Sequence, residues 1–406
     1  MPADEAIQPA VLDYNPLAPG VPLSHIEDVD RLRSQHRSFR STLAQGFWVL
    51  TQGIDIRSAL QDPGTFSSAA IVPTDPDPQY MLVPEMMDPP QHTSWRQLLA
   101  PWFSPRAVEK LGEAVRRRCV ELIEPIASRE ECEFHVDFAY RYPTSIFLEL
   151  MGLPTEDLPL FQRWNDEIHH LPFDVDPQRE RSLAAQNAVK AYFADLMELR
   201  RLEPSDDLLT AAMSWRIGDE RVAIDELLSM CLLMFQAGMD TVSSQLAYMF
   251  WHLATHPDDR RVIAEDPTVI PGAVEEFLRF YAFVAPSRRL TRDVSYAGCP
   301  MKAGEMVFIP LCGATRDPDL FDDALEFRMD RAVNNHIAFG AGPHRCLGSH
   351  LARMELRIAL EEWHSRIPEY RLADGQAIAE HGGMFGIDSL SLVWGQVPGA
   401  SDLGGV

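Results

Sequence analysis

Cys346 lies in a stretch of the chain where a reactive thiolate would be stabilised. The stretch FGAGPHRCLG, residues 339–348, places three glycines around the cysteine, and glycine permits tight turns and close approach to a flat ligand. Apolar residues recur at helical spacing from Leu351, so the cysteine directly precedes a helix N-terminus. Free N–H groups and the helix dipole favour a thiolate there. The pattern therefore indicates a thiolate beside a flat ligand.

A second unusual segment, Ala237-Gly238-Met239-Asp240-Thr241, lies in the middle of a long apolar run. Glycine costs a helix interior about 1 kcal/mol relative to alanine. Asp240 is an acid among apolar residues, which is costly unless it has a partner. Because packing explains neither residue well, the segment indicates a functional site within a helix.

Two charged pairs have helical spacing. Glu276 and Arg279 are three residues apart, and His92 and Arg96 are four apart, so each pair shares a helix face. Such pairs are common on solvated helices, and neither predicts a site alone. The remaining cysteines lack the surroundings of Cys346 and are interpreted as small core residues: Cys119, Cys132, Cys231, Cys299 and Cys312.

The elements that must position these residues are mostly helices. Residues 91–201 have a largely helical pattern, with breaks expected at prolines 125, 143, 154 and 172 and a strand-like segment at 132–139. A helix over about 224–256 would be roughly 50 Å long, with Asp240 near its middle. A further helix is predicted at 272–283.

Strand patterns are short and flanked by turn residues. A strand is predicted within residues 46–53, antiparallel strands within 288–311, and a long proline-rich loop at 64–90. The chain has no internal repeat and no linker. We therefore expect one domain over residues 1–406, mainly α with a small β portion.

The composition excludes several partners and compartments. A formal net charge of −24 argues against nucleic acid or an anionic membrane as the main partner. The cysteines have no paired spacing and the first residues lack a signal-peptide pattern, so a cytoplasmic protein is expected. The apolar stretch 227–250 is interrupted by Gln236 and Asp240, which predicts a buried helix rather than a membrane span.

The stretch Phe-Gly-x-Gly-x-His-Arg-Cys-x-Gly around Cys346 resembles the haem-binding loop of the cytochrome P450 family. The three other motifs agree with the family's order along the chain. The resemblance covers nearly the whole chain and is closest to the bacterial camphor hydroxylase type, to which DPPQHTSWRQLLAPWF, PSRRLTRD and RIPEYRLADG are similar. It implies the cytochrome P450 fold, in which a long central helix passes over haem.

The resemblance also implies roles for individual residues. Cys346 would be the axial ligand of the iron of haem b, and Asp240 with Thr241 would deliver protons during oxygen activation. Glu276 and Arg279 would form a buried structural pair. The camphor type has an aspartate near one haem propionate where this chain has Pro286. Residues expected to bind the propionates or lie against the haem are His92, Arg96, Arg288, His344, Phe339, Gly340, Gly348, Ala237 and Gly238.

The implied activity is that of a haem-thiolate monooxygenase, which uses O2 to hydroxylate an unactivated C–H bond. The chain has no flavin or nicotinamide fingerprint and no cysteine cluster, so a partner must supply the electrons. A [2Fe-2S] ferredoxin with an NADH-dependent reductase is expected, and the enzyme is expected to be a monomer. The basic patch for the ferredoxin would consist of Arg96, Arg345, Arg353 and Arg357.

Residues for the substrate follow from the register of the camphor type. Tyr80 would donate a hydrogen bond to a substrate oxygen, and Gln236 would add an amide donor. A small terpenoid with one oxygen, such as camphor or cineole, suits this pocket better than a fatty acid or a steroid. The expected substrate contacts are Tyr80, Ile71, Gln236, Leu233, Val284, Gly383 and Met384.

Two other functions would also use Cys346 as a haem ligand. A haem-based gas sensor or haem carrier would not need Asp240 and Thr241 in the middle of a helix. A peroxide-driven peroxygenase usually has Arg-Pro in place of that acid–alcohol pair, which this chain retains. Both alternatives are less consistent with the motifs than a monooxygenase.

Overall fold

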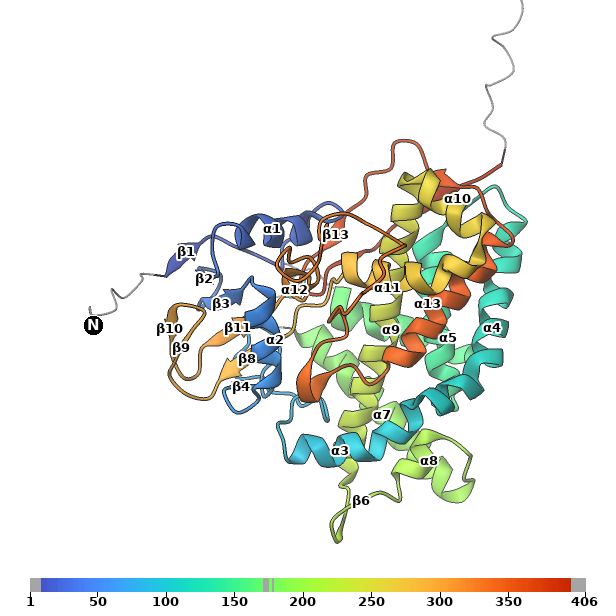
Figure 1. Cartoon of the computed structure of the whole chain (residues 1–406). Coiled ribbons are helices and arrows are strands. Elements are labelled where there is room, and N and C mark those ends of the chain that lie inside the picture. Colours follow the sequence, from blue (N-terminus) through green and yellow to red (C-terminus); the bar gives the residue numbers. More distant parts are fainter. Residues whose placement is uncertain (1–8, 171–174, 177–178, 396–406) are drawn as a thin grey trace, which may run out of the picture.

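The longest helix of the described residues, α9 (Ile224–Thr255), runs through the middle of the helical part of the molecule (Figure 1). The computed structural model describes residues 9–170, 175–176 and 179–395. At a rise of 1.5 Å per residue, the 32 residues of α9 extend for about 48 Å. Helices α5 (Arg141–Leu150) and α7 (Glu180–Leu202) pack against it.

Helix α9 is long and apolar enough by composition to cross a membrane. However, 61% of its most apolar window is buried inside the structure, which is the packing of a core helix. The acid Asp240 is also buried, with 2% of its surface exposed. The prediction of a buried helix over 227–250 is therefore consistent with the packing.

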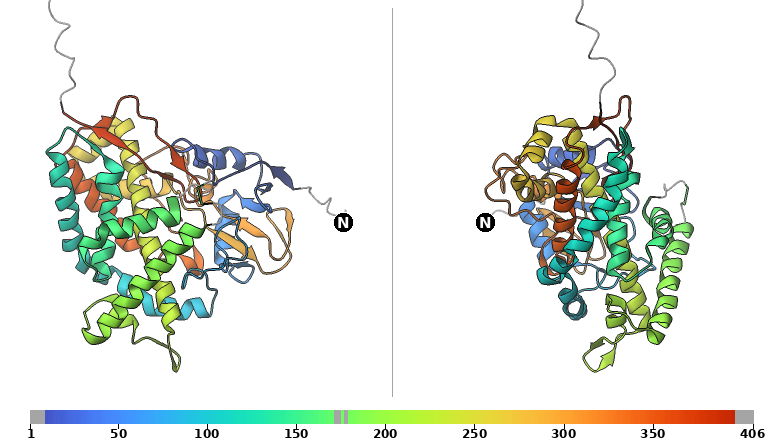
Figure 2. Two further views of the ribbon diagram at one scale, coloured as in Figure 1. Left: turned by 180° about the vertical axis from the view of Figure 1, so that it is seen from behind. Right: turned by 90° about the vertical axis from the view of Figure 1, so that its right-hand side faces the viewer.

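Helices α4 (Pro105–Ala127) and α13 (Ser349–His364) lie side by side, and α11 (Ile270–Phe280) packs against α13 (Figures 1 and 2). Helix α13 begins three residues after Cys346, so this layer supports the cysteine loop. The other helices are α1 (Ser24–Arg33), α2 (Gly53–Gln61), α3 (Gln91–Leu99), α6 (Leu158–Asn165), α8 (Leu208–Ala212), α10 (Pro257–Glu265) and α12 (Cys312–Thr315).

A six-stranded sheet lies beside the helices, on the side where the described chain begins (Figure 1). Its order is β1 (Ala10–Leu12), β2 (Ser38–Ser41), β3 (Phe47–Leu50), β11 (Met306–Phe308), β8 (Ser287–Leu290) and β4 (Phe66–Ser67). Strand β11 pairs in parallel with β3 and antiparallel with β8, where Val307 is opposite Arg288. Both end residues of β8, Ser287 and Leu290, are buried, so the sheet holds the backbone of Arg288 in place.

Four small sheets complete the described part of the chain. They pair β9 (Val294–Tyr296) with β10 (Cys299–Met301), β13 (Glu380–His381) with β14 (Gly386–Ile387), β6 (Arg216–Ile217) with β7 (Glu220–Arg221), and β15 (Ser391–Val393) with both β12 (Arg371–Leu372) and β5 (Glu131–Glu133). The expectation of a mainly α fold with a small β portion is confirmed. So are the antiparallel strands predicted within 288–311.

Two local predictions were wrong. Helix α4 continues through Pro125 to Ala127, because the proline removes only its own backbone hydrogen bond and the buried Ile123 and Ile126 hold the last turn against the core. In the predicted strand 132–139, only β5 is extended, and His135–Ala139 forms a π-helical turn. Phe134 and Phe138 are both fully buried four residues apart, which is helical spacing.

Candidate active site

A cavity of about 350 Å³ lies between α9, the loop before α13, strand β8 and the segment that enters α3. Its wall is mostly apolar, with polar side chains gathered from a few elements. Cys346, Thr241 and Arg288 all line it. These residues are far apart in the chain, so the fold brings the predicted motifs to one place.

The loop that carries Cys346 is shaped by its glycines. Gly340 and Gly342 have φ angles of +74° and +70°, which favour glycine. A Cβ on Gly342 would lie 2.3 Å from the carbonyl oxygen of Leu60, so no other residue fits there without a shift of the backbone. The N–H of Cys346 donates to the carbonyl of Phe339 at 2.8 Å, which closes the loop.

Cys346 is the only cysteine in the described chain that is exposed and lines the cavity, whereas the other five are buried. Burial raises the pKa of its thiol. The N–H of Gly348 and the charge of Arg96 lower this pKa, but they do not fully offset the effect of burial. A cation bound to the sulfur would favour the thiolate over the thiol.

Four basic side chains form a cluster at one part of the cavity, which we call the propionate cluster: His92, Arg96, Arg288 and His344. Arg96 donates to the carbonyl of Arg345 at 2.7 Å, and Arg288 donates to that of Ser287 at 2.7 Å. The rings of His92 and His344 lie 4.0 Å apart between centroids.

The propionate cluster has unused hydrogen-bonding capacity. The Nδ1 atoms of His92 and His344 are both buried without a hydrogen-bond partner. Burial and the nearby charge of His344 lower the pKa of His92 to about 4. Buried polar groups without partners are costly, and arginines favour carboxylates. The cluster therefore fits a ligand that brings two acidic groups into an otherwise apolar cavity, as haem does with its propionates.

Helix α9 presents Ala237, Gly238 and Thr241 to the cavity. The hydroxyl of Thr241 donates to the carbonyl of Ala237 at 2.9 Å. Asp240 does not line the cavity but is buried on the neighbouring face of α9. The pKa of Tyr140 is raised mainly by burial and by Asp166, and the negative charge of Asp240 makes a smaller contribution in the same direction.

Glu276 and Arg279 form an ion pair in which neither side chain is exposed, with 2.6 Å between Arg279 Nη2 and Glu276 Oε1. Arg279 also donates to three carbonyls, those of Thr315, Ala324 and Glu326. Glu276 accepts from Arg331 at 3.0 Å. The pair thus connects α11 to the long segment that leads into the cysteine loop.

The residues expected to contact haem or substrate are not all in the cavity wall. Its described lining includes Phe339, Gly340, Gly348, Leu233 and Val284. The described lining does not include Tyr80 and Ile71, which pack against the apolar cluster around Trp95 and Phe161, nor Gln236, Gly383 and Met384. A substrate role for these five residues remains a prediction.

Sequence reasoning missed several residues that line the cavity: Glu85, Phe147, Met234, Gln245, Phe283 and Glu355. Gln245 follows Thr241 by four residues on α9, so helical spacing could have indicated it. Glu85 lies in a loop without periodicity and gave no such signal.

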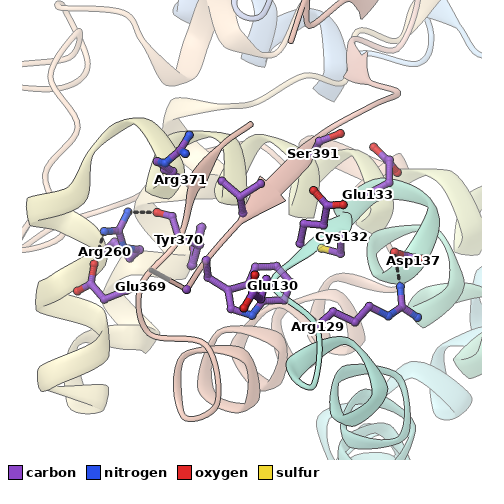
Figure 3. Close-up of a pocket in the computed structure, with 14 residues that line it drawn as sticks. Arg129, Glu130, Cys132, Glu133, Asp137, Arg260, Glu369, Tyr370, Arg371 and Ser391 are labelled. Atoms are coloured by element: carbon purple, nitrogen blue, oxygen red, sulfur yellow. Dashed lines mark hydrogen bonds and ion pairs between the residues drawn. The ribbon is translucent and has the colours of Figure 1, made fainter. Parts of the chain in front are cut away.

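A second, more open groove of about 1110 Å³ lies between β5, β12, β15 and the start of α10 (Figure 3). Two ion pairs join charged side chains of its wall. Arg129 binds Asp137 at 3.1 Å and Arg260 binds Glu369 at 2.6 Å. The groove contains none of the predicted site residues, so the cavity at Cys346 is the better candidate.

The model of the cytochrome P450 family matches residues 131–363 of this chain, which include α9, the Glu276–Arg279 pair and the cysteine loop. The chain belongs to the cytochrome P450 family. It is 34% identical to a probable cytochrome P450 127A1 of Sinorhizobium fredii, a match that covers 86% of this chain and 84% of the relative. It is also 34% identical to the vitamin D(3) 25-hydroxylase of Pseudonocardia autotrophica, over 81% and 82%.

Solved structures of this P450 family show the same fold. Cytochrome P450 CYP101C1 superposes with a TM-score of 0.88 at 30% sequence identity, covering 98% of this chain and 100% of the other. The sequence identity to CYP101C1, 30%, is slightly lower than the 34% identity to the two relatives above. The comparisons therefore support the expected closeness to the camphor hydroxylase type only loosely.

As a cytochrome P450, this protein is a haem-dependent monooxygenase in which a cysteine thiolate binds the iron. Cys346 is the cysteine of the described chain that can reach a haem in the cavity. The haem supplies the oxygen activation when bound, and the propionate cluster fits its two acidic groups. P450 monooxygenases also depend on redox partners and O2.

Proposed function

We propose that this monooxygenase hydroxylates a C–H bond of a small terpenoid, such as camphor or cineole, with electrons from a [2Fe-2S] ferredoxin and its NADH-dependent reductase. The observation that carries the proposal is that Cys346 and Thr241 line one cavity with a mostly apolar wall. An apolar wall places a hydrocarbon substrate beside the reactive centre and excludes water.

In this proposal each part of the cavity has a distinct task. Cys346 binds the iron, and the propionate cluster binds the acidic groups of the haem. Phe339, Gly340 and Gly348 line the cavity from the cysteine loop and would pack against the haem, and Ala237 with Gly238 would leave space for it on α9. Thr241, whose hydroxyl donates to the carbonyl of Ala237, would accept a hydrogen bond at its Oγ1 in the cavity, and Asp240 would relay protons to this place from the protein interior.

The substrate proposal rests on the apolar residues Leu233, Val284, Met234, Phe147 and Phe283 in the wall. Tyr80 and Gln236 would add the polar contacts expected from the camphor type. One relative is named for the hydroxylation of vitamin D(3), a larger apolar molecule, so that compound belongs in the substrate panel.

The ferredoxin proposal depends on the surface near α4 and α13. Of the four arginines expected there, Arg353 binds Glu275 at 2.6 Å and Arg357 binds Glu361 at 2.9 Å, so their charges are compensated. Arg345 is exposed, and α4 adds the exposed Arg106 and Lys110. A smaller basic patch around Arg345 is therefore proposed to meet the acidic partner. A monomer located in the cytoplasm remains part of the proposal.

The deciding experiment is the spectrum of the reduced protein with carbon monoxide. A thiolate-bound haem gives a strongly red-shifted Soret band, which Cys346→His should abolish while haem stays bound. Retention of that band in Cys346→His would show that another cysteine is the ligand.

Turnover then separates the functional alternatives. We expect product from camphor or cineole with NADH, reductase and ferredoxin, and little with hydrogen peroxide alone. Efficient peroxide-driven turnover would instead identify a peroxygenase, and haem binding without turnover of any compound would identify a sensor or carrier. Preference for vitamin D(3) over both terpenoids would overturn the substrate proposal alone.

A further inference from the structure

Glu85 places a carboxylate in the wall of the haem cavity. It lies in a tight turn before α3, in which Met86 N donates to Leu82 O at 2.8 Å and Met87 N to Pro84 O at 3.1 Å. Leu82 and Met86 are buried, so the turn is anchored on both sides of Glu85. The cavity wall around Glu85 is mostly apolar, and a carboxylate is costly in such surroundings unless it has a partner. Packing therefore does not explain an acid at this position.

Basic side chains surround this carboxylate. Glu85 Oε2 lies 3.8 Å from Nδ1 of His344, and 35% of the Glu85 side chain remains exposed. Burial raises the pKa of Glu85, but His344, Arg288 and His92 more than offset that effect and lower the pKa overall. Glu85 is therefore ionised at neutral pH.

The other carboxyl group in the wall, Glu355, has the opposite character. Burial raises the pKa of Glu355 well above its ordinary value, and its Oε2 has no hydrogen-bond partner. Burial without a hydrogen-bond partner therefore favours the neutral form of Glu355. Among the described residues that line the cavity, Glu85 is thus the carboxylate whose ionised form is favoured by its surroundings.

The charge of Glu85 acts on both sides of the site. Glu85 lines the same cavity as Cys346, so its negative charge acts on the space in which the metal ligand lies. It also partly offsets the lowering of the Arg288 pKa by burial. Just before strand β8, Pro286 lines the cavity two residues from Arg288 but carries no charge. The acidic partner of the propionate cluster therefore comes from the loop before α3.

We propose that Glu85 is a positioning residue that orients His344 in the propionate cluster and lowers the reduction potential of the haem. Reduction adds one negative charge to the haem, and a fixed carboxylate in a cavity of low dielectric constant opposes that addition. The carboxylate lies 3.8 Å from His344 Nδ1, beyond hydrogen-bond distance, and acts on the ring through its charge. Ser68 Oγ lies within hydrogen-bond distance of the other ring nitrogen, at 3.0 Å. The proposal rests on haem binding at Cys346.

The test is a redox titration of the haem-loaded protein and of Glu85→Gln, which removes the charge and keeps the shape. We expect the reduction equilibrium constant to increase about fivefold to tenfold, which is an upward shift of about 40 to 59 mV for a one-electron couple. Glu85→Asp keeps the charge and should restore a potential close to that of the unmodified protein. Glu85→Ser is a second neutral variant in case Glu85→Gln does not retain haem.

Glu355→Gln is the matched control, because it makes the same substitution in the same cavity at an acid whose neutral form is favoured by burial. Its potential should not change. The carbon monoxide spectrum of every variant must keep the red-shifted band, so that loss of thiolate ligation is separated from a change in potential. An unchanged potential in both neutral variants, or an equal shift in Glu355→Gln, would overturn the role of Glu85.

Discussion

Thr241 Oγ1 lies 2.9 Å from the carbonyl oxygen of Ala237, one turn earlier on α9, and both residues line the cavity. The bond fixes the hydroxyl at the cavity wall and leaves its oxygen available to accept a hydrogen bond. A side chain held in this way can exchange a proton at one defined position without first losing rotational freedom.

Replacing Thr241 by alanine should therefore uncouple electron consumption from hydroxylation. We expect Thr241→Ala to bind haem and substrate normally but to form much less product per NADH, with the difference appearing as peroxide. Thr241→Ser keeps the hydroxyl and should retain most of the coupling. Equal coupling in the alanine and serine variants would show that another group delivers the proton.

The buried pair of Glu276 and Arg279 should be essential for stability. Removing one partner of a fully buried ion pair costs about 3–5 kcal/mol, because the other charge is left without compensation. Glu276→Gln should therefore lower the urea midpoint strongly or prevent haem incorporation. As a control, Asp374→Asn removes the partner of Arg371 in a pair with side chains 44% and 90% exposed, and should cost less than about 1 kcal/mol. Similar losses in both variants would contradict the assigned importance of the buried pair.

The glycines in the sequence predicted two parts of the site, the cysteine loop and the turn of α9 that faces the cavity. The glycines around Cys346 were informative because Gly342 has a positive φ and nearly touches Leu60. Likewise, Gly238 marked the position on α9 that faces the cavity. These signals are local because they concern the shape of a single loop or helix turn.

What could not be predicted depends on contacts between distant segments. Glu85 and His344 are brought together by the fold across most of the chain, and neither residue's neighbours indicate the other. The sequence also did not show which arginines near Cys346 are paired with acids. In the structure, Arg353 binds Glu275 and Arg357 binds Glu361. Motifs indicated Cys346, Thr241 and the basic side chains of the cavity wall, whereas Glu85 and the ion pairs required the three-dimensional structure.

His364 should make the stability of the protein sensitive to mild acid. Burial, together with the charge of Arg260, lowers its pKa from 6.5 to about 4. Its Nδ1 donates to the carbonyl of Leu360 at 2.8 Å, and its Nε2 accepts from Tyr370 at 3.1 Å, which is the pattern of a neutral ring. The folded state therefore resists a proton that the unfolded state binds below about pH 6.5.

The contribution of His364 is fully present above pH 6.5 and is lost as the pH falls from 6.5 towards 4, by about 3 kcal/mol in total. In His364→Gln this loss should disappear, so its urea midpoint should fall less steeply between pH 6.5 and 4.5. His350→Gln, at an exposed histidine on the same helix, should keep the steep dependence. A parallel decline of the His364→Gln and unmodified proteins would contradict a neutral buried ring.

The choice of substrate should depend more on Leu233 than on Gln236, although both are on α9 and three residues apart. Leu233 lines the cavity and Gln236 does not. Leu233→Ala removes apolar surface from the wall, and at about 0.8 kcal/mol per buried CH2 it should weaken the binding of a compact terpenoid by about 1–2 kcal/mol, or roughly fivefold to thirtyfold. A nearly spherical molecule would also rotate more freely, so the mixture of hydroxylated products should broaden. Gln236→Ala should remove at most one hydrogen bond to the substrate, worth about 1 kcal/mol, and so weaken binding by no more than about fivefold, as measured by the substrate-induced spin shift. A larger effect at Gln236 than at Leu233 would show that the amide faces the substrate in the occupied cavity.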